Sequence, residues 1–258
     1  MENPLTTKRK PVIGGNWKMH TTLSEAVDLA SEVRNRLNSY GAAQTLVFPP
    51  FPFLGAVAQR LADSHIGLGA QDLHFEKKGA FTGAVSADML VSVGCAWVLV
   101  GHSERRHVFG DGDEVVGKKL RAALTAGLKP VLCIGEKLEE RKSGETFAVN
   151  RRQLRTALQG LDTAQLQHLV IAYEPVWAIG TGLVATPEQA QEVHADVRAA
   201  VGELLGGAFA AAVRIQYGGS VKAETAAGLL AKADVDGLLV GGASLKAEEF
   251  AAIVRARA

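Results

Sequence analysis

The sequence is poor in the features that mark several protein classes. It has two cysteines among 258 residues, Cys95 and Cys133, and both lie in apolar runs, "GCAWVLVG" and "PVLCIGE". Buried free thiols are expected there rather than a disulfide, which fits a reducing compartment. No Cys-x-x-Cys, His-Glu-x-x-His or Asp-rich loop occurs, and the histidines are scattered along the chain. The sequence therefore predicts no metal site.

The sequence also lacks an excess of charge and a long apolar run. Lys and Arg number 28 and Asp and Glu number 27, so the formal net charge is +1. This balance provides neither a basic field for nucleic acid nor an acidic tail. No stretch approaches the roughly 20 apolar residues of a membrane span, and the N-terminal segment lacks the apolar core of a signal peptide. We expect a cytoplasmic protein that binds neither nucleic acid nor membrane.

What the sequence does contain is a regular alternation of two patterns. Short apolar runs that end in polar or glycine-rich residues are typical of buried parallel strands; they are "VIGGNWK", "TLVFPP", "IGLGAQD", "WVLVGHSE", "PVLCIGE", "LVIAYEP", "VRIQYGGS" and "VDGLLVGGAS". Stretches with helical periodicity separate them. About eight such units, with no Pro- or Ser-rich linker, predict an α/β protein with a single (β/α)8 TIM barrel domain over residues 1–258. A doubly wound sheet is the alternative.

Several helix ends are marked in the sequence. Thr22 and Thr186 are each followed three residues later by Glu or Gln, the pattern of a capping box. Gly41 and Gly127 stand where helices are expected to stop.

The carboxyl ends of the strands meet at one face of such a barrel, where active sites are built. Glu174 follows the apolar run "LVIAY" and precedes Pro175, so it is expected at the end of a buried strand. A solvated acid is the alternative. Desolvation would make this carboxylate a stronger base near neutral pH, and we interpret Glu174 as a general base.

Two further strand ends carry polar groups that suit the same chemistry. His102 follows "AWVLVG" and precedes "SERR", which predicts a short helical turn. A helix N-terminus disfavours the imidazolium and leaves a neutral donor that can polarise a carbonyl, although a lone His is often only structural. Lys18, near the end of the first strand with Asn16, could stabilise an oxyanion or a phosphate. Glu104 and Arg105 fit a structural ion pair at least as well as catalysis.

The last two strands end in glycine pairs, "YGGSV" and "VGGAS". Glycines let backbone N–H groups approach a ligand closely, and turns at these positions of a barrel often bind phosphate. The stretch "GTGLVA" matches G-x-G-x-x-A, but it does not open a helix, so no dinucleotide cofactor is predicted.

These residues together predict proton transfer on a small phosphorylated carbonyl compound. The segment "PVWAIGTG", next to the base, would form a lid with proline and glycine hinges. Another phosphosugar barrel enzyme, an epimerase or a lyase, is an alternative that does not require this lid sequence. A catalytically inert phosphate-binding scaffold is the third, but it would be expected to have lost Glu174, His102 or Lys18.

The motifs resemble those of one family, the triosephosphate isomerases. "GGNWKM", "GAFTG", "VLVGHSERR", "CIGE", "AYEPVWAIGTG", "YGGSV" and "DGLLVGGASL" occur in that family's order across nearly the whole chain. The resemblance implies a homodimeric enzyme of glycolysis and gluconeogenesis that interconverts dihydroxyacetone phosphate and D-glyceraldehyde 3-phosphate through an enediolate, without a cofactor.

The resemblance also implies roles for single residues. Glu174 would be the base and His102 the electrophile, with Lys18 and Asn16 as electrostatic and hydrogen-bonding partners; Glu104 is a further catalytic candidate. The implied phosphate contacts are Gly180, Ser220, Gly241 and Gly242. The combination of a glutamate base with a neutral histidine is already established for this family.

One position departs from the family pattern. The segment from Gln71 to Val85 is long for a strand-to-helix connection and, by the resemblance, forms the dimer interface, with Thr82 reaching the partner's Asn16 and Lys18 region. It reads "GAFTGAVS" where the family commonly has "GAFTGEVS". Ala84 thus removes a carboxylate expected to reach across the dimer, towards a basic residue such as Arg105.

Overall fold

The computed structural model describes residues 9–180 and 182–256. Its parallel strands close into one barrel in chain order, with β1 paired to both β2 and β8. The strands are β1 (Val12–Asn16), β2 (Gln44–Phe48), β3 (Gly67–Ala70), β4 (Trp97–Val100), β5 (Lys129–Ile134), β6 (Val170–Tyr173), β7 (Arg214–Tyr217) and β8 (Gly237–Val240). The predicted (β/α)8 barrel is therefore confirmed, and the doubly wound sheet is excluded.

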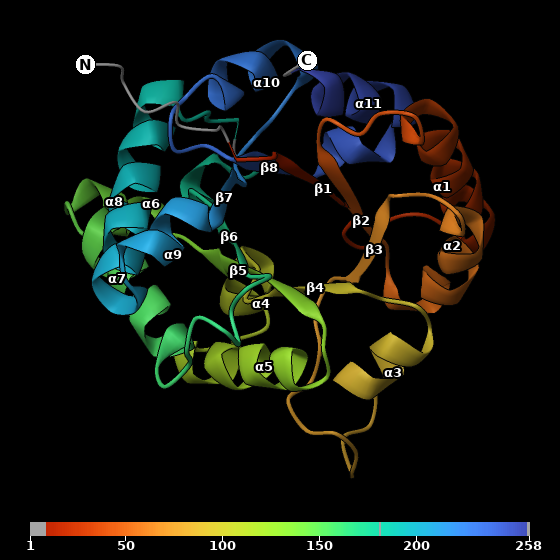
Figure 1. The fold of residues 1–258 in the computed structure, drawn as a ribbon, viewed down its shortest axis with the longest axis horizontal. Coiled ribbons are helices and arrows are strands. Elements are labelled where there is room, and N and C mark those ends of the chain that lie inside the picture. Colours follow the sequence, from red (N-terminus) through yellow and green to blue (C-terminus); the bar gives the residue numbers. More distant parts are fainter. Residues whose placement is uncertain (1–8, 181, 257–258) are drawn as a thin grey trace.

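Helices follow the strands and form the outer layer of the barrel (Figure 1). The α-helices are α1 (Leu23–Leu37), α2 (Leu54–Leu61), α3 (Ala87–Ser92), α4 (Ser103–His107), α5 (Asp113–Thr125), α6 (Leu138–Lys142), α7 (Thr146–Leu158), α8 (Pro187–Leu205), α9 (Gly207–Ala212), α10 (Ala223–Leu230) and α11 (Ala247–Arg255). Three short 3-10 helices, η1 (Phe51–Phe53), η2 (Val176–Ala178) and η3 (Gly242–Leu245), lie in loops of the described part of the chain. None of the helices in these ranges is both long and apolar enough to cross a membrane.

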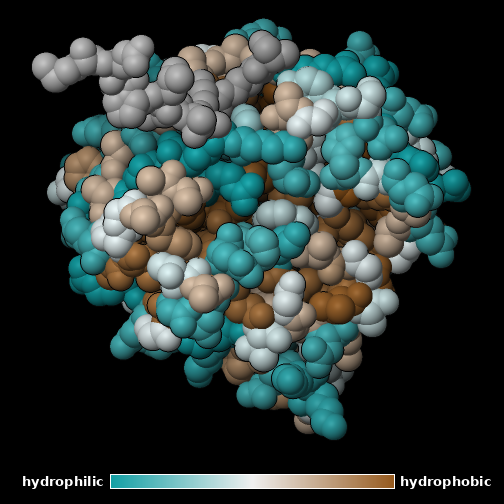
Figure 2. Space-filling view, viewed as in Figure 1, coloured by the Kyte–Doolittle hydropathy of each residue, from teal (hydrophilic) through white to brown (hydrophobic). Residues whose placement is uncertain are grey.

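The strands are apolar throughout because both of their faces are buried. In β4, Trp97 and Leu99 belong to the hydrophobic cluster inside the barrel, whereas Val98 and Val100 pack in the layer between strands and helices. Alternate side chains of a strand point to opposite faces, so a strand buried on both sides has no polar position to alternate with. Hydrophilic residues lie mostly around the periphery of the molecule, and hydrophobic ones show between them nearer the middle (Figure 2).

The helix-end signals are confirmed in three of four cases. Thr22 and Thr186 both form capping boxes, with Glu25 and Gln189. Gly127 has a φ of 79° just after α5, a left-handed conformation that glycine adopts without strain. The fourth expectation is wrong, because α1 ends at Leu37 with Asn38 as its C-cap, before Gly41 is reached.

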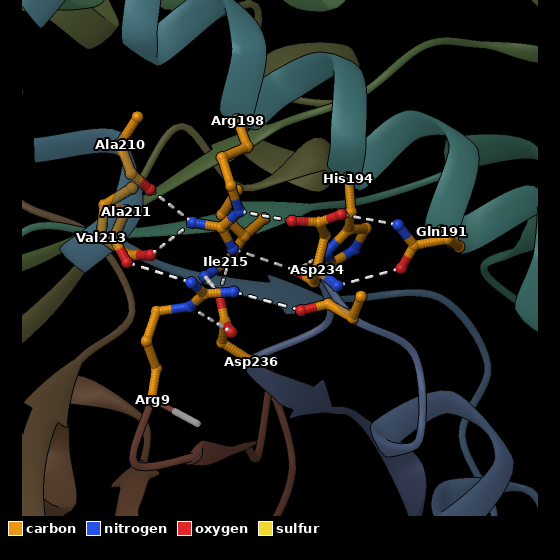
Figure 3. A network of polar contacts seen from close by, with 11 residues as sticks. Arg9, Gln191, His194, Arg198, Ala210, Ala211, Val213, Ile215, Asp234 and Asp236 are labelled. Atoms are coloured by element: carbon orange, nitrogen blue, oxygen red, sulfur yellow. Dashed lines mark hydrogen bonds and ion pairs between the residues drawn. The ribbon is translucent and has the colours of Figure 1, made fainter. Parts of the chain in front are cut away.

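A network of ion pairs joins the N-terminal segment to the start of the last strands (Figure 3). Asp236 accepts a hydrogen bond from Nε of Arg9 at 2.6 Å and another from Nη2 of Arg198 at 2.5 Å. Arg198, on α8, also pairs with Asp234 at 2.6 Å. This network lies at the end of the barrel where the strands begin. It connects the segment before β1 to α8 and to the segment before β8, at the end opposite to the predicted site.

Two further features of the fold concern the loop after β3 and the two cysteines. The segment between β3 and α3 projects beyond the ring of helices (Figure 1). Cys95 and Cys133 are buried and free, as predicted.

Candidate active site

The strand ends converge on a cavity of about 340 Å³. Of the nine predicted site residues, the following eight line it: Asn16, Lys18, His102, Glu174, Gly180, Ser220, Gly241 and Gly242. The ninth, Glu104, reaches the cavity through an ion pair with Lys18. Residues from loops spread over the whole chain are thus brought to one place by the closure of the barrel.

Glu174 is the first residue after β6, and its side chain is 2% exposed. Its Oε2 accepts a hydrogen bond from the backbone N–H of Ser103 at 2.8 Å. Two glycines make room for it. A Cβ atom on Gly218 would lie 2.9 Å from Cγ of Glu174, and one on Gly135 would lie 1.8 Å from its backbone oxygen. The buried carboxylate predicted from "LVIAYEP" is therefore a packed part of the barrel rather than a solvated acid.

His102 is the N-cap of α4, as the predicted helical turn requires. Its Nδ1 accepts a hydrogen bond from the backbone N–H of Glu104 at 3.2 Å, so the proton of the neutral ring sits on Nε2. Nε2 lies 3.0 Å from Oε1 of Glu174. The His102 side chain is thereby oriented as a hydrogen-bond donor into the cavity.

The pKa of His102 moves in the direction opposite to that expected from the helix N-terminus alone. Burial disfavours the imidazolium, but the adjacent carboxylate of Glu174 and, more weakly, that of Glu104 outweigh this effect and raise the pKa of His102. The expectation from the sequence considered only the helix terminus, because the direct contact between His102 and Glu174 becomes visible only in the fold.

Lys18 adopts a left-handed backbone conformation, with a φ of 52°. Its backbone N–H donates to Oδ1 of Asn16 at 3.0 Å, and its Nζ donates to Oε1 of Glu104 at 2.7 Å. The ammonium group also lies near the last glycine turn, because a Cβ atom on Gly241 would be 3.9 Å from Nζ. Lys18 therefore lies beside the turn predicted to bind phosphate, and Glu104 links it to His102, whose Nδ1 is 3.6 Å from Oε2 of Glu104.

Glu104 and Arg105 do not form a pair with each other through any contact observed in the described chain. Glu104 pairs with Lys18, and this hydrogen bond, together with the positive charges nearby, offsets partial burial and lowers the pKa of Glu104. Arg105 pairs instead with Asp72 at 3.0 Å and Asp111 at 3.1 Å. The two neighbouring residues thus have different partners: Glu104 binds Lys18 at the cavity, and Arg105 binds two aspartates outside the cavity lining.

The glycine turns after β7 and β8 form one wall of the cavity. Gly241 is the N-cap of η3, which starts at Gly242, and Ser220 follows the Gly218–Gly219 pair. Backbone N–H groups at such turns are suited to bind an anion. Gly180, with a φ of 69°, lines the cavity from the side of the segment that follows the base.

Sequence reasoning missed several residues around the site. The missed residues that line the cavity include Lys222, Leu239 and Glu249. Lys222 could have been noticed because it directly follows "YGGSV" and is cationic. No motif in the sequence indicates a role for Glu249, which lies on α11 and lines the cavity only because the barrel is closed.

Glu136 is a second omission, although the motif "CIGE" contains it. Its side chain is fully buried and accepts hydrogen bonds from the hydroxyl of Tyr173 at 3.0 Å and from Nε1 of Trp177 at 2.9 Å. These partners flank Glu174 in the sequence. Glu136 therefore holds the side chains of Tyr173 and Trp177, one before and one after the buried carboxylate in the sequence.

The fold and the cavity define a class of protein. A closed (β/α)8 barrel that places a buried carboxylate, an imidazole N–H and an ammonium group beside glycine-rich anion-binding turns has the parts of an enzyme that moves protons on a small phosphorylated substrate.

Comparison with known proteins identifies the family within this class. The model of the family triosephosphate isomerase matches residues 11–257. The triosephosphate isomerase of Symbiobacterium thermophilum is 54% identical over 97% of this chain and 98% of the relative. Those of Moorella thermoacetica and Carboxydothermus hydrogenoformans are 53% and 52% identical, over 95% and 96% of this chain and 98% of each relative.

The chain belongs to the triosephosphate isomerase family, as its motifs predicted. It is an aldose–ketose isomerase of triose phosphates. The alternatives of an epimerase, a lyase or an inert scaffold are thereby set aside.

Proposed function

We propose that Glu174 is the general base with which this enzyme interconverts dihydroxyacetone phosphate and D-glyceraldehyde 3-phosphate. The observation that carries this assignment is the distance of 3.0 Å between Oε1 of Glu174 and Nε2 of His102, at the wall of a cavity that also holds Lys18. A carbonyl compound bound between these groups has a base for its C–H proton and donors for its oxygen.

The reaction then needs two proton transfers at carbon. Glu174 removes a proton from the carbon next to the carbonyl group, and the electron pair moves onto the carbonyl oxygen to form the enediolate. The Nε2–H of His102 and the ammonium group of Lys18 stabilise the negative charge, with Asn16 keeping the backbone of Lys18 in place. The hydroxyl proton passes from one oxygen of the enediolate to the other, relayed by Nε2 of His102. The protonated Glu174 returns its own proton to the neighbouring carbon, so the carboxylate is restored and no cofactor is consumed.

Substrate entry must change the contacts of Glu174. Both oxygens of its carboxylate are engaged, by His102 and by the backbone N–H of Ser103. We infer that the substrate takes the place of Glu174 as the acceptor for His102, which leaves the carboxylate free to meet the C–H group. Glu104, by its ion pair with Lys18, keeps the ammonium group from turning away.

The phosphate group would bind at Gly180, Ser220, Gly241 and Gly242. Support comes from the presence of all four residues in the cavity lining and from the nearness of Lys18 to Gly241. The segment that carries Gly180 would close over the site as a lid and exclude water from the enediolate. Thr181, within the predicted lid, lies outside the described residues.

We also propose that residues 1–258 act as one domain and that two chains form a homodimer through the loop from Gln71 to Val85. Supporting observations are the projection of this loop and the exposure of Phe81 at 44%. Other apolar residues left open to solvent are Met19 at 94%, Val108 at 74% and Phe109 at 65%. Such exposure is expected of surfaces that a partner covers. The two free buried thiols support a cytoplasmic location.

The function is tested by a coupled assay with D-glyceraldehyde 3-phosphate, with no metal or nucleotide added to the isomerase step. We expect rapid formation of dihydroxyacetone phosphate. An inactive, folded protein would overturn the proposal, and sedimentation velocity on the same sample tests the dimer independently.

A further inference from the structure

The side chain of Gln71 connects three strand ends at the catalytic end of the barrel. Gln71 is the first residue after β3, and its Nε2 donates to the carbonyl oxygen of Phe48 at 2.9 Å and to that of Lys18 at 2.8 Å. Phe48 is the last residue of β2, and Lys18 lies two residues beyond β1. The carbonyl group of Phe48 also accepts the backbone N–H of Trp17 at 3.1 Å. The carboxamide of Gln71 therefore joins the carbonyl group of Lys18 to the end of β2, which itself binds the backbone N–H of the preceding residue, Trp17.

Lys18 needs such support because its backbone is strained. A φ of 52° is uncommon for a residue with a side chain. Two side chains hold this conformation, since Asn16 binds the backbone N–H of Lys18 and Gln71 binds its carbonyl group. The direction of the Lys18 side chain, and so the place of its ammonium group in the cavity, follows from this backbone conformation.

The two hydrogen bonds use both protons of the Gln71 amide, so the residue is chemically specific. Glutamate has the same shape but at most one proton to donate, and methionine fills similar space with none. An ionised carboxylate at this place would face two carbonyl oxygens and repel both.

We propose that Gln71 is a positioning residue for the isomerase reaction, which sets the backbone of Lys18 and thereby the position of its ammonium group. This inference rests on the proposed role of Lys18. Gln71 is also the root of the loop proposed to form the dimer, and the next residue, Asp72, is bound by Lys119 at 2.8 Å and by Arg105 at 3.0 Å. The dimer loop is thus coupled to the catalytic lysine within its own chain.

The first test is the pH profile of Gln71→Glu. The introduced carboxyl group can donate one hydrogen bond while protonated and none when ionised, so kcat/KM relative to the wild type should fall as pH rises. We expect a loss of about 10- to 100-fold at the alkaline end, the scale of a misplaced catalytic group. Gln44→Glu is the matched control, because the amide of Gln44 makes only long contacts, 3.5 Å to Thr45 O and 3.4 Å to His65 O, at the start of β2. A ratio that does not change with pH, or that changes equally in the control, overturns the proposal.

The second test separates an effect through Lys18 from a general loss of structure. Gln71→Met should lower kcat/KM by about 10- to 100-fold in the wild-type background but by less than about twofold when Lys18→Ala is already present. Equal losses in both backgrounds overturn the inference, and this comparison remains valid if Gln71→Glu does not fold. Wild-type protein is assayed alongside: no isomerase activity in the wild type would reject the proposed function, whereas an active wild type with additive losses would reject only the role of Gln71.

Discussion

The imidazole of His102 donates a hydrogen bond from Nε2 to Oε1 of Glu174 at 3.0 Å. The proposed electrophile and the proposed base are thus hydrogen-bonded to each other. The tautomer that permits this contact is selected at the other ring nitrogen, where the backbone N–H of Glu104 binds Nδ1. A second proton on His102 would have to displace that hydrogen bond. The local fold therefore prepares a neutral donor even though the carboxylate beside it raises the pKa of His102.

Replacing Glu174 by glutamine tests the assignment of the base. The amide keeps the shape of the side chain but cannot accept the proton, so kcat should fall by about 10² to 10⁴-fold or more, while the melting temperature changes little. Steady-state assays and thermal unfolding measure the two quantities. Glu188→Gln, at a glutamate whose side chain is 73% exposed, is the control and should retain full activity. Turnover at the wild-type level in Glu174→Gln would show that another group is the base.

The packing around Glu174 gives a second prediction. In Gly218→Ala the new methyl group would lie 2.9 Å from Cγ of Glu174 and 3.3 Å from the carbonyl oxygen of Tyr173. The carboxylate has to shift, so we expect kcat to fall by about 10- to 100-fold, with a loss of stability of about 1–3 kcal/mol. Gly55→Ala is the control, since its methyl group would meet no atom within 4 Å. An unchanged kcat in Gly218→Ala would mean that the position of the carboxylate is less restricted than the packing indicates.

The sequence predicts the strands and the catalytic end of the barrel because both depend on local order. A run such as "LVIAYEP" contains the apolar strand and the polar residue that ends it. Because parallel strands of a barrel all end at the same face, these polar residues are brought together there. This is why Glu174, His102 and Lys18 could be named together. Their positions relative to the glycine turns follow from the same topology.

Contacts between distant loops could not be predicted in this way. The bond between His102 and Glu174 depends on the side-chain geometry of two different loops, and it reverses the pKa shift that the helix terminus suggests. Gln71 carries no catalytic signature, and its hydrogen bonds join residues that are 53 and 23 positions away. Such relationships appear only once the closed barrel fixes the distances.

The proposed dimer should depend on packing more than on ion pairs between chains. Arg105, the expected partner of a carboxylate across the interface, is already bound by Asp72 and Asp111 of its own chain, and Ala84 offers no carboxylate. We therefore expect the dimer dissociation constant, measured by sedimentation velocity, to change little with salt. Ala84→Glu should tighten the dimer only weakly, and a strong decrease in wild-type affinity with added salt would contradict this account.

Removing the tip of the same loop tests its role in activity. Deletion of residues Gly79–Gly83 takes away no proposed catalytic group, yet it should give a monomer with greatly reduced kcat/KM, because the region of Lys18 loses its cover. Sedimentation velocity and the coupled assay are run on the same preparation. A fully active monomer at micromolar concentration, in the deletion variant or in the wild type, would rule out the coupling between dimer and site.

His194 gives a prediction about stability and pH. The ring is fully buried between α8 and the barrel, near Tyr173 and Tyr217 at centroid distances of 5.8 and 6.4 Å. Its Nδ1 lies 3.1 Å from the carbonyl oxygen of Asp234, whereas Nε2 has no hydrogen-bond partner within the described ranges. Burial lowers the pKa of His194 to about 4. The folded protein therefore keeps this histidine neutral.

The sign of the pH effect follows from the two pKa values. In the unfolded chain a histidine titrates near pH 6.5, so between that pH and about 4 the unfolded state of this protein binds a proton that the folded state does not. The free energy of unfolding should consequently decrease as pH falls through this window, by a total on the order of 3 kcal/mol from this group. Urea unfolding at fixed protein concentration measures it. His194→Gln should be less stable than the wild type at neutral pH but should lose less stability on acidification, whereas His65→Gln, at an exposed histidine, should follow the wild type. Parallel decreases in the wild type and His194→Gln would show that His194 is not the group responsible.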